Sequence, residues 1–331
     1  MGVRKLCVII LLFFLNTCTP FPASRLHRGA RSINDWMGKD STTTGSSTVA
    51  MNSREETFEA NEDDRLQVQE YLERNGYLPV AQVFGPRYRI SDDNFRNALQ
   101  SFQRFVHLPD TGVLDEETFR LTVSKRCGVP DLVGPAQPSG LYTSWAQWHK
   151  LDLTYRIVSH AETIAEGTLR AIVRSAMEIW MEVTPLYLCE ELDPEAHVDI
   201  TIRHERGEHG DGAAFDGLDG ALGHAFLPAT GEIHLDLDEQ WTVGRVPENN
   251  GTDYMSVVSH QIGHALGLLH SGVEGSIMFP IYTDKENINL SYQDVLSIQS
   301  LYGNADDSAD VQHRCRDRTT TSKTLTSASV S

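Results

Sequence analysis

The sequence is poor in cysteine, in basic residues and in long apolar segments. Five cysteines in 331 residues are too few for a disulfide-rich scaffold. Lysine and arginine number 28 against 46 acidic residues, for a net charge of −18. This balance argues against a nucleic-acid partner, because phosphate binding requires a basic face. The hydrophobic fraction of 40% is typical of a globular protein, and the length allows two modest domains with tails.

Residues 1–24 are typical of a secretory signal peptide. Arg4 and Lys5 precede an apolar run from Leu6 to Leu15, which is too short to span a bilayer, and no other segment is apolar enough to span a membrane. We therefore expect a protein secreted to the extracellular space or matrix, with no transmembrane segment. Signal removal would leave Cys127, Cys189 and Cys315. If Cys127 binds a metal, the other two either pair with each other or stay free.

The rest of the chain divides into a flexible lead-in, a helical region, a linker, a mixed region and a disordered tail, at residues 25–64, 65–131, 132–150, 151–303 and 304–331. The lead-in is polar, and the tail is rich in Ser and Thr. In the helical region, apolar residues at helical spacing run from Phe95 to Val106, after cap candidates at Ser91 to Asp93. Asp115 is a cap candidate for a further short helix. The linker contains Pro, Gly and Ser and is a suitable place for activating cleavage.

Residues 151–303 mix alternating and helical patterns, which indicates an α+β domain. Strands are expected where apolar residues alternate, at 153–157, 198–202 and 233–237. A long amphipathic helix is expected from Leu169 to Val183, ended by Pro185. A second helix is expected from about Asp253 to Leu266. The third strand places His234 and Asp236 on its polar face.

The stretch from His260 to His270 has the spacing of a three-histidine metal site. His260 and His264 are four residues apart and project from one helix face, and Gly267 allows the turn that returns His270. Three nitrogen ligands leave one tetrahedral position open, as in catalytic zinc sites. The residue after the first histidine normally provides a glutamate that takes a proton from bound water. Here that position holds Gln261.

Several further motifs, in order along the chain, resemble those of the matrix metalloproteinase family of metzincins. Lys125 to Asp131 looks like the family's cysteine switch, with Lys125 where proline is usual, and Ser276 to Pro280 looks like its Met-turn. The resemblance runs from about residue 65 to 303, and the sequence of residues 220–228 is most similar to epilysin-like members. No hemopexin domain is expected. The resemblance implies a metzincin catalytic domain, a mixed five-stranded twisted sheet with long helices, after a small all-α peptidoglycan-binding-like prodomain. Sugar binding is the alternative use of the prodomain fold.

The same resemblance implies two zinc ions and at least one calcium ion. His260, His264 and His270 would bind the catalytic zinc above Met278, with Cys127 as fourth ligand in the latent form and Arg126 and Asp131 orienting the switch. A structural zinc would be bound by His209, Asp211, His224 and His234. Calcium would be bound by side chains of Asp216, Asp236 and Glu239 and by carbonyls of Gly217, Asp219 and Ala221. A second calcium near Asp199 stays open.

The function implied is a secreted zinc endopeptidase, made as a latent zymogen and directed at extracellular matrix or other extracellular proteins. An extended substrate peptide would pair with the edge strand Gly220–Phe226, and Pro280 to Tyr282 would line one wall of the primed-side pocket. Proteinaceous metalloproteinase inhibitors are further candidate partners, and the chain is expected to be a monomer.

Gln261 should cripple this activity, because an amide cannot accept a proton at neutral pH. Three explanations remain: an inactive relative that binds peptides or inhibitors, an active enzyme with another base, or a sequence error or allele.

Overall fold

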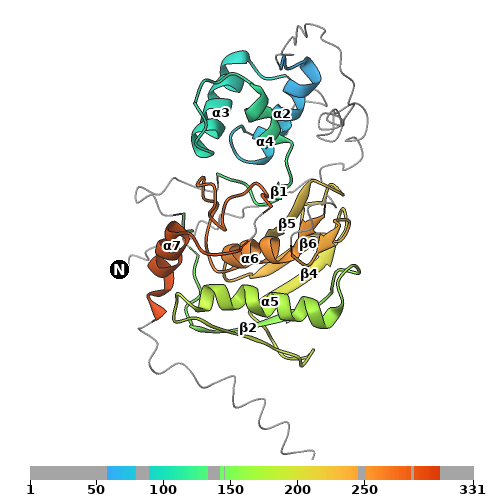
Figure 1. Ribbon diagram of the computed structural model, residues 1–331, viewed down its shortest axis with the longest axis vertical. Coiled ribbons are helices and arrows are strands. Elements are labelled where there is room, and N and C mark those ends of the chain that lie inside the picture. Colours follow the sequence, from blue (N-terminus) through green and yellow to red (C-terminus); the bar gives the residue numbers. More distant parts are fainter. Residues whose placement is uncertain are drawn as a thin grey trace, which may run out of the picture.

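The computed structural model describes residues 58–79, 89–132, 142–144, 146–244, 251–284 and 287–305. It consists of a small helical domain placed over one edge of a larger α+β domain (Figure 1). We call them the prodomain and the catalytic domain, after the resemblance given above. The expected signal peptide, Cys315 and nearly all of the tail lie outside the described residues, as do most of the lead-in and about half of the linker. No helix among the described residues is long and apolar enough to cross a membrane.

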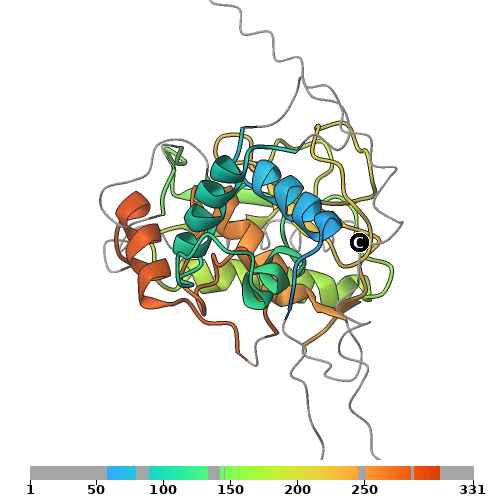
Figure 2. The ribbon, with the colours of Figure 1, turned by 90° about the horizontal axis from the view of Figure 1, so that it is seen from above.

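Three capped helices build the prodomain: α2 (Glu62–Arg74), α3 (Asp92–Phe105) and α4 (Glu116–Thr122). The side chains of Ser91 and Asp115 cap α3 and α4 as the sequence predicts. Helix α2 begins before the expected residue 65, because Asn61 forms a capping box with Asp64. From above, α2 and α3 lie over the catalytic domain (Figure 2).

The prodomain core is shared with the catalytic domain. Phe102 and Leu72 are fully buried between the helices, and Phe279 and Ile281 of the catalytic domain pack into the same cluster. Burying an apolar side chain of this size contributes roughly 1.5–3 kcal/mol. The prodomain is therefore held to the catalytic domain by apolar contact as well as by the chain connection.

The catalytic domain is built on the expected mixed five-stranded sheet, extended by one short strand from the switch. Its order is β1-β5-β6-β4-β2-β3, and only the β5–β6 pair is antiparallel within this sheet. The strands are β1 (Arg126–Cys127), β2 (Asp152–Ile157), β3 (Tyr187–Glu190), β4 (Ile200–Glu205), β5 (Ala221–Ala225) and β6 (Glu232–Asp236). The sequence did not predict β1, because two residues carry no alternating pattern.

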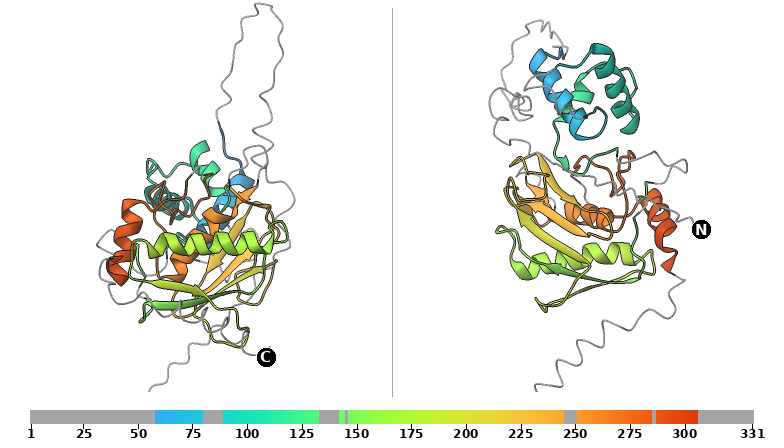
Figure 3. Two further views of the ribbon diagram at one scale, coloured as in Figure 1. Left: turned by 60° about the horizontal axis from the view of Figure 1, so that its bottom comes forward. Right: turned by 180° about the vertical axis from the view of Figure 1, so that it is seen from behind.

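Helices α5 (Glu166–Met181) and α6 (Tyr254–Ala265) pack on one face of this sheet (Figure 3). Trp180 of α5 is completely buried, and its indole N–H donates to the carbonyl of Ser259 in α6. Helix α7 (Tyr292–Tyr302) lies beside them, and β7 (Trp241–Thr242) pairs with β8 (Thr252–Asp253) just before α6. The long helix expected from Leu169 and the helix expected from about Asp253 are thus confirmed as helices.

Gly263 makes α6 sensitive to an added methyl group. A Cβ at this position would lie 2.3 Å from the sulfur of Met278 and 3.0 Å from the ring of Trp180. Alanine favours helix by about 1 kcal/mol over glycine, but overpacking costs about 1–3 kcal/mol, so we expect Gly263→Ala to destabilise the domain. Gly167→Ala in α5 is the control, because a Cβ there meets nothing within 4 Å. Urea unfolding measures the free energy of unfolding of both variants. Equal values for Gly263→Ala and Gly167→Ala would show that Met278 moves aside freely.

Candidate metal centres

The sequence around α6 positions three histidines at one point. The Asp253 side chain caps the helix by accepting from Ser256 N–H, and Gly267 ends it with φ 104°, a left-handed conformation suited to glycine. Nε2 of His260 lies 3.1 Å from Nε2 of His264 and 3.3 Å from Nε2 of His270. All three residues are buried. The structure therefore brings together the three predicted ligands.

The hydrogen bonds of the three rings leave their Nε2 lone pairs facing one another. Nδ1 of His260 and of His264 donate to backbone carbonyls of Ile277 and Leu268, at 2.7 and 2.8 Å, and Nδ1 of His270 donates to the Asp131 carboxylate at 2.8 Å. A neutral imidazole with a proton on Nδ1 has an unprotonated Nε2. Burial lowers the pKa of His264 to about 4, which keeps that ring neutral.

Three lone pairs this close repel one another unless a cation lies between them. Zinc–nitrogen bonds of about 2.0–2.1 Å at tetrahedral angles would separate the nitrogens by about 3.3 Å, close to the spacing observed. The donor set therefore fits zinc. Met278 is fully buried beside this cluster, and its N–H donates to Ser276.

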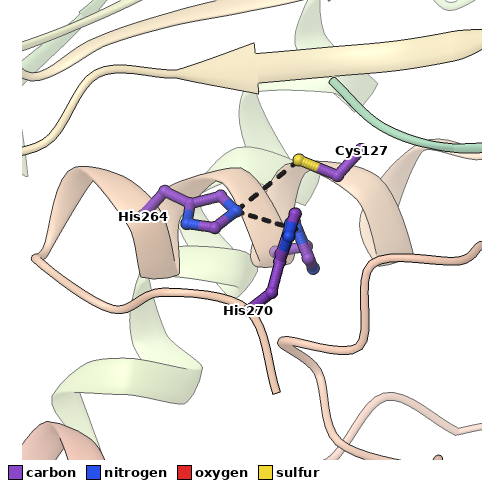
Figure 4. A group of neighbouring side chains, drawn as sticks. Cys127, His264 and His270 are labelled. Atoms are coloured by element: carbon purple, nitrogen blue, oxygen red, sulfur yellow. Dashed lines mark hydrogen bonds between the residues drawn. The ribbon is translucent and has the colours of Figure 1, made fainter. Parts of the chain in front are cut away.

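Cys127 reaches the fourth corner of this cluster from β1. Its sulfur lies 3.5 Å from Nε2 of His264, and the four ligand atoms lie within 4.8 Å of one another (Figure 4). Burial alone would raise the pKa of this thiol, whereas positive charge at the site of His260, His270 and His264 lowers it well below its usual range. A thiolate is the form that binds a metal.

Gln261 lies beside the Cys127 sulfur, and no carboxylate of the described residues is hydrogen-bonded to it. It is completely buried, and its Nε2 donates to Sγ of Cys127 at 3.3 Å. The carboxylate that contacts the histidine cluster is Asp131, which binds Nδ1 of His270 and the guanidinium of Arg126. Asp131 belongs to the predicted switch, and under that prediction it would leave with the prodomain. The contacts of the described residues thus offer no substitute for a glutamate base.

A second cluster joins the loop before β5 to β5 and β6. The Asp211 carboxylate oxygen lies 2.9, 2.7 and 2.8 Å from ring nitrogens of His209, His224 and His234. Nδ1 of His209 also bonds the carbonyl of Gly207, which orients that ring. Three nitrogens and one carboxylate oxygen converging on one point form a complete tetrahedral donor set, with no position open for a reaction. This is the predicted structural zinc set.

The predicted calcium residues gather near the same edge of the sheet. Asp236 is fully buried, and one of its carboxylate oxygens has no hydrogen-bond partner. Burial raises the pKa of Asp236 to about 6 and that of Glu239 to about 7. A buried oxygen without a partner is unfavourable, whereas a divalent cation bound by carboxylates and carbonyls would satisfy it. The residues present therefore fit calcium.

The comparisons with known proteins agree with this arrangement. Residues 147–303 match the family model described as matrixin, and residues 61–121 match a peptidoglycan binding domain model. The chain is 38% identical over 234 residues to matrilysin of Rattus norvegicus, which covers 67% of this chain and 84% of that protein. The chain belongs to the matrixin family.

Other relatives of this matrixin are longer. Stromelysin-1 of Mus musculus is 39% identical over 223 residues, covering 64% of this chain and 44% of that protein. The hatching enzyme of Paracentrotus lividus is 35% identical over 235 residues, covering 70% of this chain and 38% of that protein. The chain thus spans less than half the length of these two relatives. The finer resemblance to epilysin-like members stays a prediction.

The predicted switch, Lys125 to Asp131, is held by polar contacts that the sequence predicted only in part. Arg126 and Asp131, the two residues predicted to orient the switch, form an ion pair with each other at 2.6 Å. Two tyrosines of the prodomain complete these contacts: the Tyr71 hydroxyl contacts Arg126, and the Tyr77 hydroxyl donates to Asp131 at 2.9 Å. Nothing in the local pattern marks these tyrosines, because they lie far from the switch in sequence.

The β5 edge, predicted to pair with substrate, carries the switch in this structure. Arg126 and Cys127 run parallel to β5, and Gly128 N–H donates to the carbonyl of Gly223 at 2.8 Å. A pocket beside the cluster is lined by Leu222, Val257, Pro280 and Tyr282 among others. The last two were expected there. The switch therefore covers the same edge that an extended peptide would require.

Two smaller predictions can also be followed in the structure. Cys189 is disulfide-bonded, so it does not stay free, and Cys127 is the free cysteine among the described residues.

The Asp199 carboxylate, considered for a second calcium, is bound by Lys150 at 2.6 Å and by the N–H of Thr154 at 2.8 Å. A lysine therefore already balances its charge.

Proposed function

We propose that this matrixin is a secreted zinc endopeptidase made in a latent form, with turnover crippled by Gln261. The observation that carries the proposal is the convergence of three histidine Nε2 atoms and the Cys127 sulfur on one point, with Gln261 beside them. We assign the catalytic zinc to His260, His264 and His270. Its substrates would be extracellular matrix or other extracellular proteins.

A zinc ion bound there would activate a water molecule and polarise a peptide carbonyl. The described residues would supply the rest of the reaction. The β5 edge would hold the peptide backbone, and the pocket beside His260 would accept a side chain. Gln261 can hydrogen-bond a water molecule but cannot take its proton. We therefore expect peptide binding to be retained and hydrolysis to be slow.

Latency in this proposal comes from Cys127 at the fourth position. Gln261 favours this closed state, because its amide N–H donates to a thiolate that a glutamate would repel. The same contact favours a second candidate function, a protein that binds peptides or metalloproteinase inhibitors without cutting them. Both candidates place a zinc at each histidine cluster and at least one calcium at the acidic residues.

The two functions differ in residual turnover. The full chain, cleaved in the 132–150 linker so that the prodomain dissociates and then loaded with zinc and calcium, would be given a fluorogenic peptide and, separately, a peptide hydroxamate. The proposal predicts hydroxamate binding in calorimetry and slow cleavage that disappears when zinc is removed. Binding with no detectable cleavage would favour the binding protein. Failure to bind the hydroxamate would contradict both.

A further inference from the structure

Two cations of the prodomain are placed against the acidic residues of the proposed calcium site. The Lys125 ammonium lies 2.7 Å from a carboxylate oxygen of Asp219 and 4.0 Å from one of Glu239. Arg74 at the end of α2 lies 3.3 Å from the Asp216 carboxylate. Lys125 also donates to the hydroxyl of Thr252 at 3.1 Å. The matching position in the switch motif is usually proline, so this contact belongs to the present sequence.

The Lys125 contact is a good candidate for a specific interaction. The lysine side chain is only 13% exposed and Glu239 is completely buried. Glu239 also accepts from the backbone N–H of Asp219 at 2.7 Å and lies 3.4 Å from the Thr252 hydroxyl, so one network joins the switch to the loop and to β8. Lys125 precedes Arg126 and Cys127 directly, so its position affects the thiol.

At Asp219, Lys125 and calcium would use different atoms, whereas the carboxylates of Glu239 and Asp216 would face both calcium and a cation of the prodomain, Lys125 at 4.0 Å and Arg74 at 3.3 Å. The calcium set uses the carbonyl of Asp219, whereas Lys125 binds its side chain. A divalent cation together with Lys125 and Arg74 would balance the carboxylates of Asp216, Asp219, Asp236 and Glu239. The loop also contains left-handed residues, Gly217 at φ 87° and Asp219 at φ 68°. A non-glycine residue keeps such a conformation only when its surroundings hold it.

We infer that calcium and the prodomain are linked through the Lys125–Asp219 pair. Calcium fixes the loop that presents Asp219. Lys125 then holds the switch strand in place, and the Cys127 thiol leaves the histidine cluster less often. Removing calcium frees the loop and abolishes the contribution of Lys125. The inference rests on the proposed latent site and calcium site.

The test measures how fast Cys127 of the full chain reacts with a maleimide, followed on its peptide by mass spectrometry. We expect Lys125→Met to speed the reaction about threefold in calcium, a modest effect because Asp219 is one-third exposed and the pair is screened by salt. Lys125→Arg should react like the wild type. Asp219→Asn, which tolerates the left-handed backbone, should match Lys125→Met, and the double variant should be no faster.

The matched control is Lys150→Met, which removes a lysine from an aspartate pair of the catalytic domain at 2.6 Å and should leave the rate unchanged. Protein dialysed free of calcium but kept in zinc should show no difference between Lys125→Met and wild type. In calcium, adding Lys125→Met to a chain that carries Asp236→Asn should likewise leave the rate unchanged. A wild-type rate for Lys125→Met in calcium would overturn the inference. A difference that persists or grows without calcium would overturn the linkage. Rapid wild-type reaction would overturn the latent site itself.

Discussion

Replacing Gln261 with glutamate is expected to raise kcat/KM for a fluorogenic peptide by about 10²–10⁴, the usual contribution of a general acid–base group. The comparison uses chains with and without Gln261→Glu that have been cleaved in the 132–150 linker, so that the dissociated prodomain does not cover the site. The gain should appear in kcat, because the residue lies against the ligand cluster and adds a function needed only in the transition state. The amide and the carboxylate have nearly the same shape, so the fold should not change.

Gln261→Ala separates charge from shape in this experiment. If proton transfer is what the wild type lacks, the alanine variant should be as slow as glutamine or slower. Equal rates for glutamine and glutamate would show that another group acts as base. In a chain that retains Cys127, Gln261→Glu should also speed maleimide reaction of the thiol, because a carboxylate replaces the N–H donor 3.3 Å from the sulfur.

Loss of the second histidine cluster is expected to have the largest effect on stability. Structural zinc contributes apparent binding free energies of about 10–16 kcal/mol in small domains, comparable with the roughly 5–15 kcal/mol stability of a whole protein. His224→Ala should therefore lower the unfolding temperature by more than about 10 °C and remove one of two zinc ions. His197→Ala, at an exposed histidine, is the control. A variant that keeps both ions and its unfolding temperature would contradict the assignment.

The parts of the fold that the sequence predicted are those with local signals. Alternating apolar residues marked β2, β4 and β6, helical spacing marked α3 and α5, and cap candidates preceded α3. Likewise the spacing of His260, His264 and His270 was enough to place them together. These signals are local because backbone geometry fixes which side chains within one element share a face.

The contacts that sequence patterns could not supply join distant segments. Tyr77 binds Asp131, and Asp294 of α7 accepts from the Ser276 hydroxyl at 2.6 Å and the Ile277 N–H at 3.0 Å, fixing the turn beside the cluster. Neither pairing has a periodicity, because each depends on how separate elements pack. Lys125 was noted only as a departure from a motif, and its acidic partners became visible through tertiary structure.

The most direct test of the central claim is the absorption spectrum of the full chain with cobalt in place of zinc. A thiolate bound to cobalt produces a near-ultraviolet charge-transfer band, and only the cluster containing Cys127 has a sulfur, since the other offers His209, Asp211, His224 and His234. We expect this band in the wild type, its loss in Cys127→Ser, and d–d absorption from both sites in each. A wild-type spectrum without the band would show that Cys127 does not occupy the fourth position.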